Sequence, residues 1–225
     1  MINHLAIIMD WNRRWAKSKF LPSFAWHKAW ADNVDRIASL AMDKWIKYLT
    51  LWWLSNDNLK KRDKKEIEWI IKIINSTESF LWEMILKNIK FQVIWNIEEL
   101  PKKSQQILES IVEKTKNNTW ITFTIALIYW WQDEIVRATK KIIKKWLDPE
   151  KITREEFRKY LDTNILPVPD IIVRTGWDTR HSWFLLYDSE YSEYYFTKKQ
   201  WPEFNEEDID KVIECFKKSK RNFGK

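Results

Sequence analysis

Residues 4–17 read His4-Leu5-Ala6-Ile7-Ile8-Met9-Asp10-Trp11-Asn12-Arg13-Arg14-Trp15-Ala16-Lys17. The run Leu5–Met9 has the length of a strand and is apolar at every position, which is typical of a strand buried on both faces of a parallel sheet. The carboxylate of Asp10 and the guanidinium groups of Arg13 and Arg14 follow at once. Because ligands of parallel sheets bind where the strands end, we expect a binding site for a charged group directly after this strand.

Apolar runs of strand length alternate with helical patterns through the rest of the chain. The five further strand candidates are residues 48–54, 91–94, 121–128, 171–173 and 184–187. Apolar residues spaced three and four apart mark helices between them, at residues 34–41, 67–74, 108–115 and 135–142. This order predicts an α/β fold: a single domain over residues 1–225 with a six-stranded, mostly parallel sheet flanked by helices.

The composition is that of a globular protein, with 32% charged and 45% hydrophobic residues. The longest nearly apolar stretch, Ile121–Trp131, is too short to span a bilayer, and the single Cys215 suits a reducing compartment. We therefore expect a cytoplasmic protein. The net charge of +7 points to anionic partners, which leaves nucleic acid, lipid headgroups and phosphorylated small molecules as candidates.

Glycine and tryptophan have abnormal frequencies. The 225 residues contain 2 glycines and 17 tryptophans, although glycine normally makes up about 7% of a protein. Several tryptophans stand where the backbone favours glycine, such as Trp45 and Trp146 at the ends of helical patterns. Only Trp15, Trp52 and Trp201 have ordinary aromatic surroundings, and glycine at the other fourteen positions would raise its share to about 7%.

We therefore hypothesise that a UGA codon, read as glycine in the source of this protein, has been translated as tryptophan. Fourteen bulky replacements at roughly 1 to 3 kcal/mol each would exceed the total stability of about 5 to 15 kcal/mol that proteins have. The alternative is a protein that is truly rich in tryptophan. The fourteen positions are Trp11, Trp26, Trp30, Trp45, Trp53, Trp69, Trp82, Trp95, Trp120, Trp130, Trp131, Trp146, Trp177 and Trp183.

Polar and charged clusters follow several of the predicted strands, and a parallel sheet brings such clusters together at one edge. They lie at residues 10–14, 55–58 and 174–180, with Glu193 beyond the sixth predicted strand. A carboxylate beside two arginines suits a Mg²⁺ diphosphate, because the hard cation takes carboxylate and phosphate oxygens and arginine binds phosphate in a bidentate manner. A solvated charged turn is the simpler alternative for residues 10–14 taken alone.

A second anion site is predicted at residues 174–182, where Arg174 and Arg180 flank a glycine-containing turn and Ser182 follows. A structural cluster of ion pairs explains the same residues equally well. His27, at the start of a helical pattern, suits either a phosphate or a structural hydrogen bond. Glu193 by itself is weak evidence for a site.

Taken in order, these segments resemble the signature blocks of the cis-prenyltransferase family, of the undecaprenyl diphosphate synthase (isoprenyl transferase) type. The resemblance extends from His4 to Gly224, and tryptophan stands wherever the blocks have glycine, which supports the codon hypothesis independently. Besides residues 4–17, the matching blocks are Trp26-His27-Lys28-Ala29-Trp30, Leu54-Ser55-Asn56-Asp57-Asn58, Tyr129-Trp130-Trp131, Arg174-Thr175-Gly176-Trp177, Tyr191-Ser192-Glu193-Tyr194-Tyr195-Phe196 and Trp201-Pro202-Glu203-Phe204.

The resemblance implies a Mg²⁺-dependent enzyme and assigns roles to these blocks. It implies that Asp10 is the catalytic carboxylate that holds Mg²⁺ with the diphosphates, and that Glu193 is a second metal-binding carboxylate, supplied across a homodimer. Asn58 matches the position assigned to proton removal. The implied substrate-binding residues are Trp11, Asn12, Arg13, Arg14, Trp15, Ser23, His27, Ser55, Asn56, Asp57, Leu59, Lys61, Arg174, Arg180, His181 and Ser182.

A few positions depart from the family pattern. Ser23 stands where many members have arginine, Asp57 replaces a common glutamate, and Leu59 replaces a common aromatic residue. Lys61 and the adjacent Arg62 compete for a position usually held by arginine. These departures bear on affinity and chain length more than on the class of reaction.

The implied reaction condenses isopentenyl diphosphate with an allylic diphosphate, farnesyl diphosphate by resemblance, and forms cis double bonds. Its product would be a polyprenyl diphosphate, of undecaprenyl length by resemblance, that serves as a cell-wall lipid carrier. We expect peripheral contact with the inner face of the membrane through this product. We expect no nucleic-acid partner, because the sequence contains no recognisable nucleic-acid-binding module.

The alternative is a non-catalytic partner subunit of a heteromeric cis-prenyltransferase. Such a scaffold needs no set of groups that binds a metal and two diphosphates. The sequence keeps that set in Asp10, Asn12, Arg174, Arg180 and Glu193, which favours the enzyme.

Overall fold

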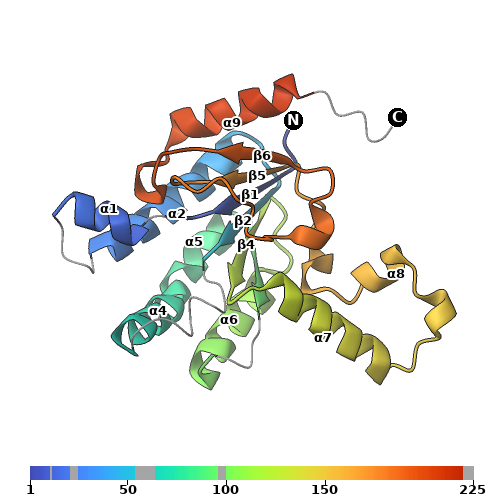
Figure 1. Ribbon diagram of the computed structural model, residues 1–225. Coiled ribbons are helices and arrows are strands. Elements are labelled where there is room, and N and C mark those ends of the chain that lie inside the picture. Colours follow the sequence, from blue (N-terminus) through green and yellow to red (C-terminus); the bar gives the residue numbers. More distant parts are fainter. Residues whose placement is uncertain (11, 21–24, 54–63, 96–99, 220–225) are drawn as a thin grey trace.

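The computed structural model describes residues 1–10, 12–20, 25–53, 64–95 and 100–219 (Figure 1). Within these ranges it does not describe the side chains of residues 12, 13, 25–27, 65, 66 and 95. Among the described residues, none of the helices combines the length and the apolar composition that a membrane-spanning helix requires.

Six parallel strands form one sheet, as predicted. In spatial order they are β3 (Ile89–Trp95), β4 (Ile121–Leu127), β2 (Tyr48–Trp52), β1 (His4–Ile8), β5 (Ile171–Arg174) and β6 (Glu193–Phe196). β2, β4 and β3 lie on one side of β1, and β5 and β6 lie on the other side. The carboxyl ends of β1 and β5 therefore meet at the point where the strand order reverses, and ligands of such sheets bind at this point.

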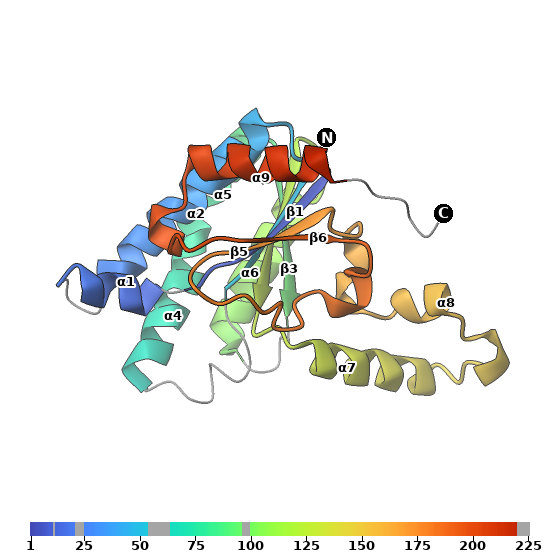
Figure 2. The same ribbon diagram turned by 45° about the horizontal axis from the view of Figure 1, so that its top comes forward.

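Helices flank the sheet (Figures 1 and 2). The described α-helices are α1 (Asn12–Ser18), α2 (Ala25–Asp43), α4 (Lys64–Ser76), α5 (Leu81–Leu86), α6 (Lys102–Thr115), α7 (Trp131–Lys144), α8 (Arg154–Arg158) and α9 (Glu206–Lys218). The described 3-10 turns are η1 (Thr77–Phe80), η3 (Pro149–Lys151), η4 (Asp162–Ile165), η5 (Leu186–Asp188) and η6 (Trp201–Glu203). Figure 2 shows α7 and α8 extending away from the sheet.

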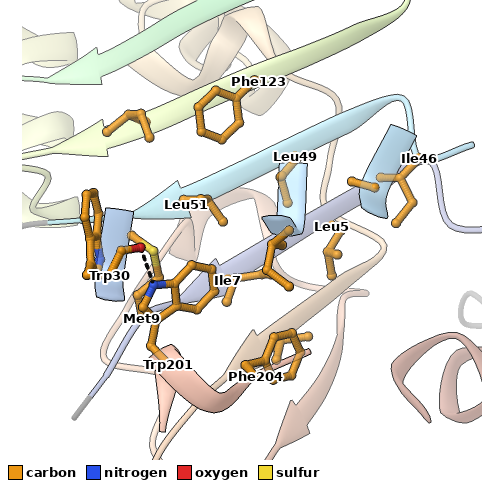
Figure 3. Close-up of a cluster of buried hydrophobic side chains, with 14 of the residues drawn as sticks. Leu5, Ile7, Met9, Trp30, Ile46, Leu49, Leu51, Phe123, Trp201 and Phe204 are labelled. Atoms are coloured by element: carbon orange, nitrogen blue, oxygen red, sulfur yellow. Dashed lines mark hydrogen bonds between the residues drawn. The ribbon is translucent and has the colours of Figure 1, made fainter. Parts of the chain in front are cut away.

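The sheet is buried on both faces. Leu5 and Ile7 of β1 pack into a large cluster that α2, α4, α6 and α9 complete (Figure 3). Ala6 and Ile8 pack on the opposite face into a smaller cluster that contains Phe184. Side chains alternate between the faces of a strand, so a strand covered on both sides is apolar on both, which explains the unbroken apolar run from Leu5 to Ile8 in β1.

The prediction of a sixth strand at residues 184–187 is wrong. Phe184 is fully buried and stacks on Trp52 at 5.0 Å between ring centroids, and Leu185 has φ of 52°, outside the strand region. The apolar run therefore covers the second face of the sheet instead of extending its edge. β6 begins at Glu193, so this carboxylate lies at the start of a strand, not beyond its end.

The backbone supports the glycine hypothesis at three positions. Trp45, Trp146 and Trp183 have φ of 62°, 51° and 62°, in the left-handed region that favours glycine. Trp146 is also 92% exposed. Trp201, which the hypothesis leaves as tryptophan, is fully buried instead.

His4 joins β1 to its neighbours as a neutral ring. Its Nδ1 donates to the carbonyl of Pro167 at 2.7 Å, and its Nε2 accepts from the hydroxyl of Thr50 at 2.8 Å. Burial lowers the pKa of His4 from 6.5 to about 4, against the raising effects of the Pro167 carbonyl and of Asp170. Below pH 6.5 the unfolded chain therefore takes up a proton that the folded protein resists until about pH 4.

We expect His4 to make the free energy of unfolding fall by up to about 3 kcal/mol as the pH is lowered through this window. Urea denaturation of the parent and of His4→Asn measures the effect. The difference between the two proteins should shrink toward low pH, whereas a constant difference would contradict the buried neutral ring.

Candidate active site

Asp10 and Arg174 meet at the predicted edge of the sheet. Arg174 is the last residue of β5 and lies level with Ile8, the last residue of β1, so Asp10 follows two positions later. Nε and Nη2 of Arg174 contact Oδ2 of Asp10 at 2.8 and 2.5 Å. The structure thus confirms that these two sequence-distant residues come together.

The electrostatics of Asp10 reflect partial burial. Burial raises the pKa of the Asp10 carboxyl, and the positive charge of Arg174 opposes this effect. Both contacts from Arg174 go to Oδ2, and Oδ1 has no hydrogen-bond partner in the part of the chain that the structure describes. Within the described residues, nothing competes with a ligand or a cation for this oxygen.

The backbone of Asp10 is held on both sides. Its N–H donates to the hydroxyl of Thr175 at 3.0 Å, and its carbonyl accepts from the backbone N–H of Trp201 at 3.2 Å. Thr175 is fully buried and also hydrogen-bonds the carbonyl of Ile8. Thr175 and Trp201 stand in the matching sequence blocks, but no role at the site was predicted for either residue.

The loop after β5 is organised around Arg174. Nη1 of Arg174 donates to the hydroxyl of Ser182 at 2.7 Å and to the backbone carbonyl of Arg180. The side chain of Arg180 is 65% exposed and forms two bonds to Asp178, at 2.7 and 3.1 Å. Ser182 has φ of 46°, and strained backbone of this kind is concentrated at functional sites.

The remaining predicted site residues lie in three situations. Trp15 is part-buried and donates from its indole to Glu203 at 3.2 Å, and Arg14 is exposed. Nδ1 of His181 accepts from the backbone N–H of Trp183 at 3.0 Å, which is a structural contact. Asn12, Arg13 and His27 lie in described helices, but their side chains are not described. The predicted positions outside the described residues are Trp11, Ser23, Ser55, Asn56, Asp57, Asn58, Leu59 and Lys61.

Glu193 lies at the amino ends of the strands, whereas Asp10 lies just beyond their carboxyl ends. It pairs with Ile171 at the start of β5, which is level with Leu5 of β1. Asp10 lies five residues further along than Leu5, which corresponds to about 16 Å along the strand direction. Glu193 accepts a hydrogen bond from the hydroxyl of Ser219. The two carboxylates of one chain therefore cannot share a metal ion.

An apolar cavity of about 420 Å³ opens between α2, α4, α5 and strands β3 and β4. Trp30 and Trp53 line it beside the carboxyl edge of the sheet and stack on each other at 4.7 Å between ring centroids. Ile89, at the start of β3, and the ion pair of Glu83 with Lys87 line it toward the other edge. This cavity was not predicted from the sequence.

No cluster of three or more metal-binding side chains occurs among the described residues. The donor set nevertheless fits Mg²⁺, which usually binds one or two carboxylates and completes its shell with water and substrate phosphate oxygens. The Asp10 carboxylate is such a ligand, and the guanidinium of Arg174 holds it in place.

Comparisons with known proteins agree with this geometry. An isoprenyl transferase of Oceanobacillus iheyensis is 37% identical over 99% of this chain and 90% of its own. The farnesyl-diphosphate-specific ditrans,polycis-undecaprenyl-diphosphate synthase of Micrococcus luteus is 36% identical over 98% of this chain and 90% of its own. The crystal structure of lavandulyl diphosphate synthase from Lavandula x intermedia, in complex with dimethylallyl diphosphate, matches with a TM-score of 0.91 and 31% identity over 100% and 98% of the two chains.

The fold and the sequence relatives define the protein as a prenyltransferase. The family model of undecaprenyl diphosphate synthases matches residues 8–224, and the chain belongs to this family. The resemblance seen in the sequence blocks is therefore confirmed. A structure of a probable undecaprenyl diphosphate synthase from Campylobacter jejuni, with a TM-score of 0.83 and 27% identity over 100% and 99% of the two chains, has the same fold.

Proposed function

We propose that the protein condenses isopentenyl diphosphate with an allylic diphosphate in a Mg²⁺-dependent reaction that forms cis double bonds. The observation that carries this proposal is the Asp10–Arg174 pair at the carboxyl ends of the strands, together with an apolar cavity of about 420 Å³ to which Trp201 connects it. The carbonyl of Trp30, a cavity residue, binds the indole of Trp201, whose backbone N–H binds Asp10. Charged diphosphates would thus lie at the edge of the sheet while the growing hydrocarbon enters the cavity.

Four described polar side chains would bind the metal and a diphosphate in this reaction. Asp10 would hold Mg²⁺ through Oδ1, and when bound, Mg²⁺ neutralises negative charge on diphosphate oxygens. Arg174, Arg180 and Ser182 would bind the diphosphate of isopentenyl diphosphate, because guanidinium and hydroxyl groups donate to phosphate oxygens. Arg180 would exchange its present partner, Asp178, for that phosphate.

The allylic carbon–oxygen bond breaks, and its electron pair leaves with the diphosphate. Asn12, Arg13, Arg14 and His27 are the residues that we assign to this leaving group. The isopentenyl double bond forms the new carbon–carbon bond, and a proton is then lost from the isopentenyl unit. We assign its removal to the position of Asn58, which lies outside the described residues.

We assign farnesyl diphosphate as the allylic substrate and a polyprenyl diphosphate of undecaprenyl length as the product. The Micrococcus luteus relative, which is farnesyl-diphosphate-specific and forms undecaprenyl diphosphate, supports this assignment. The apolar lining of the cavity by Ile73, Phe91 and Phe123 suits a hydrocarbon chain.

We also propose that the active unit is a homodimer in which Glu193 serves the site of the partner. The separation of Glu193 from Asp10 within one chain supports this arrangement, because only a second chain could bring such a carboxylate to the metal. A twofold dimer would complete two equivalent sites.

The location we assign is the cytoplasm, with peripheral contact at the inner face of the membrane, where the product would serve as a cell-wall lipid carrier. A released polyprenyl chain would partition into the bilayer because each buried methylene contributes about 0.8 kcal/mol. The net charge of +7 favours an anionic headgroup surface.

Incubation with farnesyl diphosphate, labelled isopentenyl diphosphate and Mg²⁺ tests the proposal. The chain should be produced both as written and with glycine at the fourteen positions. We expect a labelled polyprenyl diphosphate that disappears when EDTA removes the metal. If neither form incorporates label, a non-catalytic partner subunit becomes the better explanation.

A further inference from the structure

The η6 turn contacts the candidate active site at two points, although it comes from the far end of the chain. Its first residue, Trp201, donates its backbone N–H to the carbonyl of Asp10 at 3.2 Å. Its last residue, Glu203, accepts a hydrogen bond from the indole of Trp15 at 3.2 Å. The turn therefore holds the chain at both ends of the segment that carries Asn12, Arg13 and Arg14.

Two side chains of α2 hold this turn. Asn33 is 1% exposed, and its Nδ2 donates to the carbonyl of Trp201 at 2.5 Å. Its Oδ1 accepts from Nε of Arg36 at 2.8 Å and also from Nη2. Nη2 of Arg36 donates further to the carbonyls of Phe204 and Pro202, at 3.1 and 3.4 Å. One Asn–Arg pair thus binds three carbonyl groups of the turn and its exit.

Packing and one hydrogen bond fix the indole of Trp201 in this turn. Trp201 and Phe204 are fully buried, and Figure 3 shows the Trp201 indole beside Met9 with its hydrogen bond to Trp30. The orientation of the peptide groups depends on their hydrogen bonds, and Asn33 binds the peptide carbonyl that follows the Trp201 N–H. Loss of this bond would leave a buried carbonyl with one partner fewer and allow the turn to rotate.

We propose that Asn33 and Arg36 are positioning residues for prenyl transfer, which act through the η6 turn on the backbone of Asp10 and on Trp15. This inference rests on the proposed function. A carboxylate that holds a metal ion for catalysis must itself be held in place, since a displacement of about 1 Å can lower a rate about 100-fold. Neither residue touches the diphosphates in this scheme.

Two variants separate positioning from folding. Arg36→Gln removes the guanidinium fork, and Asn33→Asp keeps the acceptor for Arg36 but loses the donor to Trp201. We expect each variant to lower kcat about tenfold or more and to raise the Mg²⁺ concentration needed for half-maximal activity. The KM for isopentenyl diphosphate should stay within about twofold, because Arg174 and Ser182 are unchanged.

Arg158→Gln is the matched control. Arg158 on α8 likewise binds a backbone carbonyl, that of Leu166 at 2.7 Å, and a side chain, that of Asp188 at 2.7 Å. It should lower Tm by a similar amount and leave kcat and the Mg²⁺ requirement unchanged.

The outcomes distinguish the two levels of the proposal. Parental kcat and Mg²⁺ requirement in both α2 variants, whatever their Tm, would overturn the positioning role and leave the proposed function standing. A parent that does not turn over at all would overturn the proposed function, and the positioning role with it. Equal kinetic losses in the Arg158 control would show a general effect of destabilisation and would also overturn the positioning role.

Discussion

A heterodimer of one Asp10→Asn chain and one Glu193→Gln chain is expected to regain about half of the parental turnover, although each variant alone is inactive. Each substitution should lower turnover on the order of 10³-fold, because it removes a carboxylate that would hold Mg²⁺ where negative charge develops on the leaving diphosphate. In a twofold dimer where Glu193 serves the partner, one site of the heterodimer keeps both carboxylates and the other has neither. Co-expression with two affinity tags and sequential purification isolates this species for assay.

The geometry within one chain makes the result informative. Glu193 lies at the amino edge of the sheet and Asp10 at the carboxyl edge, so complementation requires the second chain. A heterodimer of Asp10→Asn with Arg174→Gln is the control, because these two side chains contact each other within one chain and neither site would be complete. Equal activity of the two heterodimers would contradict the shared site, and so would failure to recover any two-tag species.

The sequence predicts the edge of the sheet at which the site forms, because each strand is marked by its own local pattern. The unbroken apolar run from Leu5 to Met9, which forms most of β1, requires burial on both faces, and charged residues follow it directly. Parallel pairing then brings Asp10 to Arg174 without any further information. This part of the site follows from short-range chemistry and one topological rule.

Other features depend on packing between distant segments. The residues 184–187 have a strand-like composition, but Phe184 finds a stacking partner in Trp52 across the second face of the sheet. Glu193–Phe196 form the edge strand instead. Apolar composition alone cannot distinguish a segment that covers a sheet from one that extends it.

The cavity and the η6 turn are also tertiary features. Small residues at Ala31, Ala38 and Ser39, on the face of α2 that lines the cavity, are a sequence signal of space beneath that helix. Asn33 and Arg36 resemble ordinary polar helix residues, and their function is visible only where the carbonyls of residues 201–204 reach them. Side chains that act on a remote backbone leave no local pattern.

The same substitution, tryptophan to glycine, is expected to have opposite effects at two classes of position. Trp146→Gly should raise the free energy of unfolding by about 1 kcal/mol, because φ of 51° is unfavourable for any residue with a Cβ atom and the 92% exposed indole loses little burial. Trp201→Gly, the control, should lower it by about 3 to 5 kcal/mol, since the fully buried indole leaves a cavity. Urea denaturation measures both; a loss of stability at position 146 would count against glycine there.

Replacement of all fourteen tryptophans by glycine is expected to raise turnover and to lengthen the products. Trp30, Trp53 and Trp69 line the apolar cavity, and the first two stack where it approaches Asp10. Glycine at these positions would open the path for the growing chain, so we expect turnover at least about tenfold above that of the chain as written, with longer products. Chromatography of the labelled polyprenyl products measures both quantities.

Trp30 is the position that puts the codon hypothesis at greatest risk. Its side chain is only 4% exposed, so its removal from a truly tryptophan-rich protein would cost several kcal/mol. In a protein that evolved with glycine there, the neighbouring α2 residues pack without it and the cavity is filled by substrate. Trp30→Gly should then lower the free energy of unfolding of the chain as written. The same substitution should lower it by less in a chain that already has glycine at the other thirteen positions. Intact mass of protein from its native source decides the matter, because a mass matching the written sequence contradicts the hypothesis at every position.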